Sequence, residues 1–541
     1  LTVNNTNGVG GGLLFKGVGS TGVVTIPNLI LDGGYVRHAS GVGDLFQLAG
    51  NVILRNSPTI DAGQGNIRVL GAISGAGSLT KKGAYTLTLA GGQNSYTGGT
   101  VVQAGTLVLE GGGATGAIRG SLSIGSGATV KLAAVDALGW QGSAVAVTQI
   151  DIAGTLDNAV SGNNSYLASW TLTGGTISST GGGTYQIRAG QGKTITSLAS
   201  GKTSYIRADV AIRDADSILP IIVEDGTASS DLWITGSLRN SSYEAGSNGI
   251  RKQGLGTLVL AGANTYTGPT DVEAGTLRVA HAAALAESPV TVAAGATLFV
   301  GAGLTLRSPA VTLAGGTLSA SAVTVGADGV GSLSLLDGVL AGGTTLQVGT
   351  GGVMSLAADA RVTAGLSGLS VDQAAGGRLD LGAGELIVAA GGISAADLRA
   401  DIIAGRAGGG WTGPGIASAA AAASGGTRAV GYVVQADGTA RVSYAAAGDI
   451  ELDGDVDVFD LVGINGAGLY GTGASADWAG GDANYDGVTN VFDLVGINTA
   501  GAYGQGRYFP AAPAATAAAA VPEPTAGIGM LIAAAILLRR R

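Results

Sequence analysis

Residues 75–109 read GAGSLTKKGAYTLTLAGGQNSYTGGTVVQAGTLVL, and residues 246–279 read GSNGIRKQGLGTLVLAGANTYTGPTDVEAGTLRV. The two segments match along most of their length, with one single-residue shift each way between the aligned positions. Three pairs of residues fix the alignment at a spacing of 170: Lys82 and Lys252, Asn94 and Asn264, and Tyr96 and Tyr266. A repeat of this kind is the signature of an architecture built from stacked units.

A shorter period runs within and after these segments. Strand-like stretches of the type Gly-Thr-Leu-x-Val recur about every 20 residues. The apolar positions that mark this period are Leu87, Leu107, Leu258, Leu277, Leu298 and Leu318. Each stretch offers two or three apolar residues on one face and ends at Gly, Asn or Asp, which indicates a short strand followed by a turn. Such a unit cannot bury its own apolar face, but stacked neighbours can.

The pattern predicts an all-β fold in which residues 1–445 form a right-handed parallel β-helix with one coil per repeat. Leu, Val and Ile would stack inside, while Thr, Ser and Asn would line the outside. At about 4.8 Å per coil, the rod would be on the order of 100 Å long. A string of β-sandwiches is the alternative, but their hairpins favour Asn-Gly and Asp-Gly turns, which are scarce here.

The composition agrees with a folded repeat protein. The chain has 541 residues with 99 Gly, 11 Pro and no Cys. We expect the glycines at coil corners, where the backbone needs a positive φ or room for a neighbouring coil. A hydrophobic content of 45% argues against a disordered chain. The lack of Cys excludes disulfides, thiolate zinc sites and cysteine nucleophiles.

The charge of the chain is concentrated in one short region. The formal net charge is -9, yet residues 448–494 hold ten acids and no Lys or Arg. Without them, 27 acids face 28 bases. The body of the chain is therefore near neutral, and it offers no basic surface for nucleic acid.

The acidic region is a duplication. Val-Phe-Asp-Leu-Val-Gly-Ile-Asn occurs at 458–465 and again at 491–498, each copy preceded by a loop rich in oxygen ligands. Positions 1, 3, 5, 9 and 12 are Asp449, Glu451, Asp453, Asp457 and Asp460 in the first loop, and Asp482, Asn484, Asp486, Asn490 and Asp493 in the second. Position 6 is Gly454 or Gly487, and position 7, which offers its backbone carbonyl, is Asp455 or Val488. Ca²⁺ takes six to eight oxygen ligands around such a turn, so we expect two Ca²⁺ sites. The alternative is two acidic turns without a metal.

Asp at position 12, the duplication and the short helix expected after each loop resemble a type I dockerin over residues 446–505. The resemblance implies a protein-binding module whose partner is a cohesin. Positions 10 and 11, Val458 with Phe459 and Val491 with Phe492, match the sites where the family recognises its partner. Alternatively, these apolar side chains pack the two helices against each other.

The repeats at 75–109 and 246–279 carry a second resemblance. Their Lys-x-Gly start, Thr-Leu-x-Leu strand, Asn-x-Tyr-Thr-Gly turn and Ala-Gly-Thr-Leu end resemble the autotransporter-associated β-strand repeat. That family implies an exported β-helical passenger and no particular reaction.

The C-terminal segment reads VPEPTAGIGMLIAAAILLRRR over residues 521–541. Its apolar run of 13 residues would give roughly 20 Å of helix, shorter than a bilayer core. Terminal arginines would hold that end in the cytoplasm. The pattern resembles a PEP-CTERM sorting signal, which implies processing by an exosortase; an ordinary tail anchor is the alternative. The residues of this motif are Val521, Pro522, Glu523, Pro524, Arg539, Arg540 and Arg541.

Two low-complexity stretches suggest boundaries. Residues 405–427 are rich in Gly and Ala and predict a boundary before the last strands, and residues 506–520 predict a linker. Since Leu1 is not an initiator Met, we expect the natural N-terminus, with a signal peptide, to lie upstream.

Catalytic residues are hard to find. The two histidines, His38 and His281, are far apart in sequence, and the best enzymatic candidates are Asp214, Asp216, Glu224 and Asp225 with Arg207 and Arg213. Solvated turns are the favoured explanation for these acids. Tyr96 and Tyr266 could stack on sugar rings, although packing within a turn is favoured.

The sequence therefore predicts an exported, non-enzymatic structural or adhesive protein of the cell surface or envelope, transiently anchored in the membrane by its C-terminal helix. An extracellular polysaccharide is a candidate ligand. A polysaccharide-degrading enzyme on the same scaffold, or a component recruited to a complex through the dockerin-like module, are the alternatives.

Overall fold

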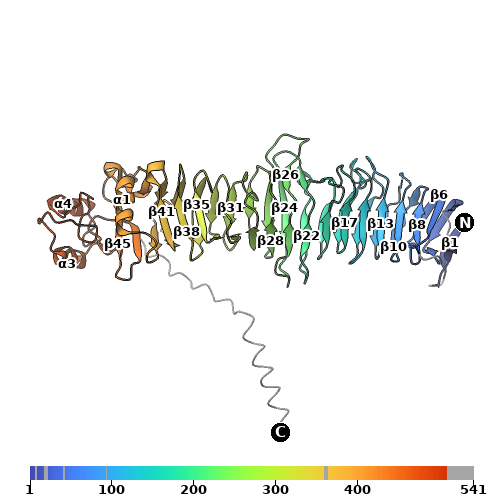
Figure 1. Ribbon diagram of the computed structural model, residues 1–541, viewed down its shortest axis with the longest axis horizontal. Helices are drawn as coiled ribbons and strands as arrows, with labels where there is room; N and C mark the ends of the chain where they lie inside the picture. The colour runs from blue at the N-terminus through green and yellow to red at the C-terminus, as the bar shows by residue number, and fades with distance from the viewer. Residues whose placement is uncertain (7–8, 17–21, 40–42, 93, 359–362, 509–541) are drawn as a thin grey trace, which may run out of the picture. The chain divides into compact units, whose positions relative to one another are not determined.

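The computed structural model describes residues 1–6, 9–16, 22–39, 43–92, 94–358 and 363–508. The chain forms two compact units, Leu1–Tyr444 and Ala445–Arg541. The first unit is a parallel β-solenoid of about 16 turns, whose coils Figure 1 shows stacked side by side. The predicted all-β solenoid is confirmed, and the β-sandwich alternative is wrong because successive strands pair in parallel.

Two long parallel sheets make up most of the rod, and the first ends at β37 (Val339–Leu340), whereas the second continues to β44 (Gly415–Ala417). The strands of the first sheet are β1 (Thr2–Thr6), β4 (Val23–Asp32), β6 (Leu45–Arg55), β8 (Asn66–Val69), β9 (Ile73–Gly75), β11 (Thr86–Leu89), β13 (Thr106–Leu109), β15 (Thr129–Leu132), β17 (Thr155–Asn158), β19 (Thr176–Ser178), β22 (Ser204–Ile206), β25 (Leu232–Ile234), β28 (Thr257–Leu260), β30 (Thr276–Val279), β32 (Thr297–Val300), β34 (Thr317–Ser319) and β37 (Val339–Leu340), with β2 (Val9–Gly10) antiparallel to β1.

The second long sheet follows the same order of coils. Its strands are β3 (Gly12–Phe15), β5 (Tyr35–His38), β7 (Thr59–Asp61), β10 (Leu79–Lys82), β12 (Thr100–Val102), β14 (Gly120–Ile124), β16 (Val147–Ile152), β18 (Ser169–Leu172), β21 (Ile195–Ser197), β24 (Ile218–Val223), β27 (Gly249–Gln253), β29 (Thr270–Val272), β31 (Val290–Ala293), β33 (Val311–Ala314), β36 (Ser332–Leu335), β39 (Val353–Leu356), β42 (Arg378–Asp380) and β44 (Gly415–Ala417).

The third side of the coils is less regular, and only some coils carry a strand there. β20 (Tyr185–Arg188), β23 (Val210–Arg213) and β26 (Leu238–Asn240) form one short sheet, and β35 (Ala322–Val325), β38 (Thr345–Val348) and β41 (Gly368–Val371) form another. Three 3₁₀ turns are η1 (Ala189–Gln191), η2 (Gln373–Ala375) and η3 (Ala407–Gly409).

The leucines that mark the sequence period stack as predicted. Leu258 pairs with Leu277, Leu277 with Leu298, and Leu298 with Leu318, and all four are fully buried. On the outer face, the threonine that precedes each of these leucines forms a parallel column, from Thr257 to Thr317. Because a strand alternates its side chains between two faces, one register places every Leu inside and every Thr outside.

The rod is shorter than the sequence predicted. Several coils in the middle of the unit are longer than the sequence repeat, as the pairing of Tyr205 with Trp233 and of Trp233 with Val259 shows. The extra residues lengthen turns at the sides of the coil and add no rise along the axis. With about 16 turns, a spacing of about 4.8 Å gives roughly 75 Å, in place of the expected 100 Å.

Glycine occupies coil corners where the backbone has a positive φ and lies close to a neighbouring coil, as expected. Gly83, for example, has a φ of +80°, and a Cβ built on it would lie 2.4 Å from the carbonyl carbon of Ala62 in the preceding coil. Any side chain there would both strain the backbone and collide with the neighbouring coil.

A fully buried lysine occupies this corner. Lys81 Nζ donates hydrogen bonds to the carbonyl oxygens of Lys82, Gly83 and Ala104, at 3.0, 2.6 and 2.7 Å. The carbonyl of Lys82 also accepts a hydrogen bond from the N–H of Ala62 in the preceding coil, and the ammonium group joins the three carbonyls of the corner.

Lys252 fills the equivalent corner of the second repeat. Its Nζ donates to the carbonyls of Gln253, Gly254 and Ala274, at 3.2, 2.6 and 2.9 Å. The predicted alignment of Lys252 with Lys82 is therefore wrong by one residue, since the side chain of Lys82 is exposed. Alternation on the strand places only one of the two adjacent lysines inside, and it is Lys81.

The Asn-x-Tyr segment of each repeat is an internal brace. Asn94 accepts a hydrogen bond from the N–H of Ile73 and donates to the carbonyl of Ala117, both at 2.8 Å, so it links the coils on either side of its own. Asn264 makes the same two bonds. Tyr96 and Tyr266 are buried, and their hydroxyls lie 2.6 Å from a threonine Oγ1. The packing explanation for the tyrosines is thus confirmed.

The predicted boundary at 405–427 is wrong, because these residues close the C-terminal end of the solenoid. They begin in the last turn of α1 (Ala395–Arg406) and include β44, which pairs with β42, and α2 (Ala419–Ala423). β43 (Glu385–Val388) pairs in parallel with β40 (Thr363–Leu366) and antiparallel with β46 (Ala440–Ala445), and β45 (Ala429–Val434) completes this sheet. Trp411 is buried here, which gives the Gly- and Ala-rich segment an apolar anchor.

Up to residue 508, where the described part of the second unit ends, this unit contains the helices α3 (Val458–Ala467) and α4 (Val491–Ala500). A small core joins them, built from Ala446, Val456, Ile464, Ile497, Ala500 and Ala502. In the part of the chain that the structure describes, no helix is both long and apolar enough to span a bilayer.

Candidate functional site

The two acidic loops of the second unit lead directly into its helices. The position-9 side chain, Asp457 or Asn490, accepts a hydrogen bond from the N–H two residues further on, at 2.6 and 2.8 Å. The position-12 carboxylate, Asp460 or Asp493, accepts one from the N–H of position 9, at 2.8 Å in both loops. These reciprocal bonds form a capping box, which explains why α3 and α4 begin where they do.

The position-12 carboxylates also reach back across their loops. Asp460 accepts a hydrogen bond from the N–H of Ile450 at 2.9 Å, and Asp493 accepts one from the N–H of Ala483 at 3.0 Å. Both side chains are buried. Each loop is therefore closed on itself, with position 2 tied to the first turn of the helix.

The position-1 carboxylates organise the other half of each loop. Asp449 accepts from the N–H groups of positions 5 and 6 at 3.2 and 3.1 Å, and Asp482 accepts from its equivalents at 3.0 and 2.9 Å. Both are fully buried. Buried carboxylates are rare unless they are paired or hold a cation.

The backbone of the two loops is the same at its unusual positions. Gly454 and Gly487, at position 6, have φ values of +96° and +95°, as the glycine there predicted. Leu452 and Tyr485, at position 4, have φ values of +60° and +63°, a region that non-glycine residues seldom adopt. No sequence signal predicted this second feature. Backbone strain repeated in two copies is typical of functional loops.

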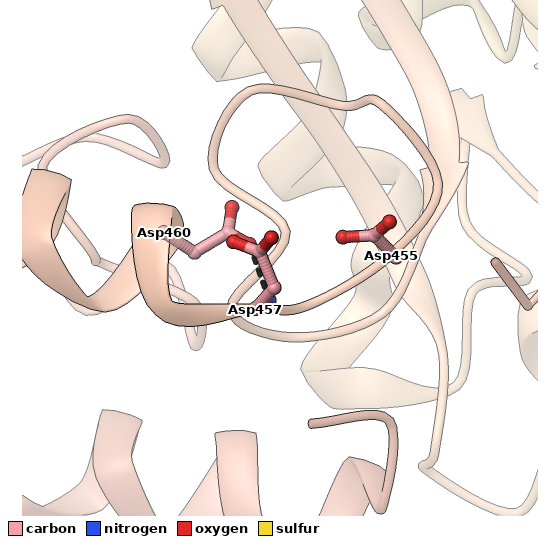
Figure 2. Close-up of side chains that lie close together, drawn as sticks. All are labelled: Asp455, Asp457 and Asp460. Atoms are coloured by element: carbon pink, nitrogen blue, oxygen red, sulfur yellow. Dashed lines mark hydrogen bonds between the residues drawn. The ribbon is translucent and has the colours of Figure 1, made fainter. Parts of the chain in front are cut away.

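Figure 2 shows three carboxylates that gather in the first loop. Ligand oxygens of Asp455, Asp457 and Asp460 lie within 4.8 Å of one another. The sequence assigned only a backbone carbonyl to Asp455, whereas the structure places its carboxylate with those of positions 9 and 12. Asp453 instead accepts a hydrogen bond from the N–H of Asp455 at 3.1 Å.

Side chains of the second loop converge in a similar way. The amides of Asn484 and Asn490, at positions 3 and 9, both donate to Oδ2 of Asp486 at position 5, at 3.1 and 3.3 Å. Val488 at position 7 donates its backbone N–H to Asp486 at 3.0 Å. Positions 3, 5 and 9 thus lie together, although they come from different parts of the loop.

The electrostatics of the first loop are unfavourable without a cation. Burial, together with the neighbouring charges of Asp460 and Asp453, raises the pKa of Asp449 to about 7. Burial and mutual repulsion also raise the pKa values of Glu451, Asp455 and Asp460. In the second loop, the pKa of Asp493 is raised for the same reasons. A hard cation would reverse these shifts, and an all-oxygen donor set of this kind fits Ca²⁺.

Two aromatic residues that the sequence did not single out support the first loop. Tyr508 donates its hydroxyl to Asp449 Oδ2 at 2.5 Å, and its backbone N–H bonds to the carbonyl of Gly454. Trp478 is buried and donates its indole N–H to the carbonyl of Asp449 at 2.7 Å. Tyr508 is far from Asp449 in the chain, and it lies in the segment that the sequence predicted to be a linker.

The position-10 and position-11 side chains point to solvent in both copies. Val458 and Val491 are 53% and 54% exposed, and Phe459 and Phe492 are both 68% exposed. These residues therefore do not pack the two helices together. The next turn of each helix adds Val462 and Val495, which are also exposed and which the sequence analysis missed. Their spacing of three and four residues from positions 11 and 10 was the available signal.

The carboxylates of the rod that were candidates for an enzymatic site make hydrogen bonds and ion pairs in turns. Asp214 and Asp216, between β23 and β24, have positive φ values; Asp214 pairs with Arg188 at 2.5 Å, and Asp216 accepts from the N–H of Ser247. Glu224 accepts from the N–H of Ala199.

The two candidate arginines have different partners: Arg213 bonds to Glu244, whereas Arg207 lies over the ring of Tyr205. Of the two histidines, His38 is buried and His281 bonds to the N–H of Ala283. None of these contacts gathers the candidates into one site. The C-terminal motif of Val521, Pro522, Glu523, Pro524, Arg539, Arg540 and Arg541 lies outside the described residues.

Two segments of the rod match a known family of repeats. A family model described as the passenger-associated-transport-repeat matches residues 79–109 and 250–279. The first residues of the two matches, 79 and 250, differ by 171, as do Lys81 and Lys252, in agreement with the corner geometry.

An alignment 301 residues long, which covers 50% of this chain, shows 30% identity to the adhesin BmaC autotransporter of Brucella suis biovar 1 (strain 1330), and it spans 8% of that protein's length. No solved structure matches the chain. The solenoid thus contains passenger-type repeats and is similar in sequence to part of an autotransporter adhesin.

Proposed function

We propose that this chain is an exported, non-enzymatic adhesin-type protein whose solenoid is displayed at the cell surface. The observation that carries the proposal is the coil corner built on Lys81 and Lys252, because it joins the solenoid geometry to the passenger-repeat match in the same residues. The relative that shares half of this chain is named an adhesin and an autotransporter. A surface role also suits a rod whose described carboxylate candidates stabilise turns.

The second unit acts in this proposal as a calcium-dependent, dockerin-like module. In the first loop the ligands are the side chains of Asp449, Glu451, Asp453, Asp457 and Asp460, together with Asp455. In the second loop they are Asp482, Asn484, Asp486, Asn490 and Asp493, with the carbonyl of Val488. Bound Ca²⁺ supplies positive charge among ten acids that have no Lys or Arg in the same stretch.

The exposed valines and phenylalanines of α3 and α4 are the partner face of this module. An apolar surface repeated on two helices favours a protein partner, and we propose a cohesin-like domain. Binding would attach the rod to a larger surface assembly.

We also propose that residues 521–541 act as a sorting signal that an exosortase-type enzyme recognises, which would place the protein in the cell envelope. The test is fractionation and protease shaving of cells that express the full chain or a chain ending at residue 520. We expect the full chain in the envelope and exposed to external protease, and the truncated chain to be mislocalised. Intact full chain protected in the cytosol would contradict the proposal.

Calcium binding is tested by calorimetry on the full chain. We expect two sites, with Asp460→Asn and Asp493→Asn each removing one. Asp477→Asn is the matched control, since Asp477 bonds to the N–H of Gly480 and occupies none of the loop positions. Absence of heat in the unmodified protein, or an equal loss in the control, would contradict the calcium sites.

A further inference from the structure

A column of planar side chains runs along the outer face of the first long sheet. Tyr205 on β22 pairs in register with Trp233 on β25, and Trp233 pairs with Val259 on β28. The register continues from Val259 to Arg278 on β30 and from Arg278 to Phe299 on β32. Five successive coils thus place an aromatic, aliphatic or guanidinium group at one position, which is Thr176 in the coil before them and Ser319 in the coil after them.

The rings and guanidinium groups of this column stack on one another. The rings of Tyr205 and Trp233 lie 6.4 Å apart at an angle of 22°, and the guanidinium of Arg207 lies 4.7 Å from the centre of the Tyr205 ring. At the other end, the guanidinium of Arg278 lies 5.6 Å from the centre of the Phe299 ring. A guanidinium at this distance from a ring is attracted by the electrons of the aromatic face.

These two arginines differ from others on the rod because the guanidinium group of each lies over an aromatic ring, whereas the others pair with a carboxylate. Arg37, Arg68, Arg251 and Arg378 form ion pairs with acidic side chains at 2.5 to 3.3 Å. Within the described residues, the side-chain contacts of Arg207 and Arg278 are with Tyr205 and Phe299. Both arginines are exposed; Arg278 lies on β30, Arg207 directly follows the end of β22, and the five strands of the column contain no Asp or Glu. The column and the adjacent Arg207 therefore carry two positive charges that no acid on these strands neutralises.

We propose that this column binds an acidic polysaccharide, one that bears carboxylate or sulfate groups. The apolar face of a pyranose ring stacks on an aromatic ring, and a guanidinium binds a carboxylate or sulfate through two parallel hydrogen bonds. Coils repeat at about 4.8 Å, comparable to the length of one sugar unit in an extended chain. Val259 is fully buried at the centre of the column, so the stacking surfaces lie on either side of it.

The shape of the column favours an extended chain over a globular partner. It is one side chain wide and several coils long, whereas a stable protein interface buries about 800 Å² on each partner. This inference rests on the proposed surface role, which would expose the column to glycans, and it names the ligand class.

The test is binding of the purified full chain to polygalacturonate, which carries carboxylates, to heparin, which carries sulfates, and to neutral dextran. We expect polygalacturonate or heparin to bind at low salt, with affinity that falls as salt rises, and dextran not to bind. The arm that binds more tightly identifies the anionic group.

Variants test the column itself. Trp233→Ala and Phe299→Ala should each weaken binding about tenfold, from the loss of one stacking surface, and the double variant Arg207→Gln and Arg278→Gln should remove most of the salt dependence. Trp140→Ala and Arg68→Gln are the matched controls, because Trp140 is an exposed tryptophan in the loop between β15 and β16 and Arg68 is paired with Glu110. Circular dichroism checks that each variant is folded.

Equal binding of dextran, no binding of either acidic glycan, binding only of an acidic protein, or equal losses in the controls would each overturn the proposal. Surface display is scored separately by protease shaving. A displayed rod that binds no acidic glycan contradicts this inference alone, and a rod that binds glycan but stays inside the cell contradicts the proposed function alone.

Discussion

Lys81 and Lys252 place their ammonium groups in the same corner of two coils that belong to different repeats, and each is held by three backbone carbonyls. A buried lysine without a carboxylate partner would ordinarily be costly. Here the corner itself provides the acceptors, so the lysine and the turn stabilise each other.

Replacement of Lys81 should therefore destabilise the rod. Lys81→Met keeps the apolar stem but removes the ammonium donor from three carbonyls of the corner, of which that of Lys82 keeps its bond from the N–H of Ala62. A loss of about 1–3 kcal/mol in the free energy of unfolding is expected, because buried polar groups then lack partners. Urea unfolding followed by circular dichroism measures it. Lys82→Met is the matched control and should change stability by less than about 0.5 kcal/mol.

The same lysines predict a pH dependence. Burial lowers the pKa values of Lys81 and Lys252 to about 8, although nearby Asp61 and Asp231 partly offset this effect. In the unfolded chain the lysines titrate near 10.5. Between these values the unfolded state holds protons that the folded state has released, so the free energy of unfolding should rise with pH.

The useful window is pH 8 to 10. Burial raises the pKa values of Tyr96 and Tyr266, which would lower stability above pH 10, where the unfolded tyrosines ionise. Urea unfolding of the unmodified chain and of a chain with Lys81→Met and Lys252→Met should give different slopes against pH in this window. Identical slopes would show that the lysines do not titrate there.

Because Asn94 braces two coils, its replacement should lower the free energy of unfolding more than the replacement of a polar residue at the surface. Asn94→Leu removes the acceptor for Ile73 and the donor for Ala117 in one step, so about 2 kcal/mol or more should be lost. Asn163→Leu is a control, because its amide bonds to the hydroxyl of the exposed Tyr243. Comparable losses in both variants would argue against a bracing role for Asn94.

Substitutions in the partner face of the second unit should abolish partner binding without changing the stability of the unit. Phe459→Ser and Phe492→Ser remove exposed side chains, so the free energy of unfolding should change by less than about 0.5 kcal/mol. Capture of a cohesin-like partner in the presence of Ca²⁺ should be lost, and EDTA should release it from the unmodified chain. Ile464→Ala, in the core, should instead cost about 2–5 kcal/mol.

Tyr508 should affect one calcium site and not the other. Its hydroxyl bond lowers the pKa of Asp449 from the value that burial alone would produce. Tyr508→Phe should therefore make Asp449 harder to ionise and weaken Ca²⁺ binding at the first loop several-fold, with the second loop unchanged. Calorimetry at pH 7 distinguishes the two sites. An equal change at both loops would contradict the assignment.

The repeating part of the fold was predictable because its causes are local. Alternation of Leu with Thr at a regular period fixes both the register and the inside of the coil. The sequence could not predict the long coils between β17 and β28, because extra residues in turns leave the strand pattern unchanged. It also could not show which of Lys81 and Lys82 is buried, since an aligned pair of lysines permits either choice.

The acidic loops show a similar division. Ligand spacing, the position-6 glycines and the two helices follow from the sequence. The role of Tyr508 does not follow from the sequence, because a contact between residues so far apart in the chain leaves no local pattern. The strained backbone at Leu452 and Tyr485 does not follow from it either. Composition predicted a boundary in the Gly- and Ala-rich stretch at 405–427, but composition alone does not show that Trp411 anchors this stretch.

The parallel pairing of the coils has a mechanical consequence. Hydrogen bonds between successive coils run along the axis of the rod, so tension between its ends would load one coil at a time. A coil of about 20 residues that peels away would release about 65 Å of chain. Under shear, such a rod would lengthen stepwise and dissipate force before its outermost contacts break.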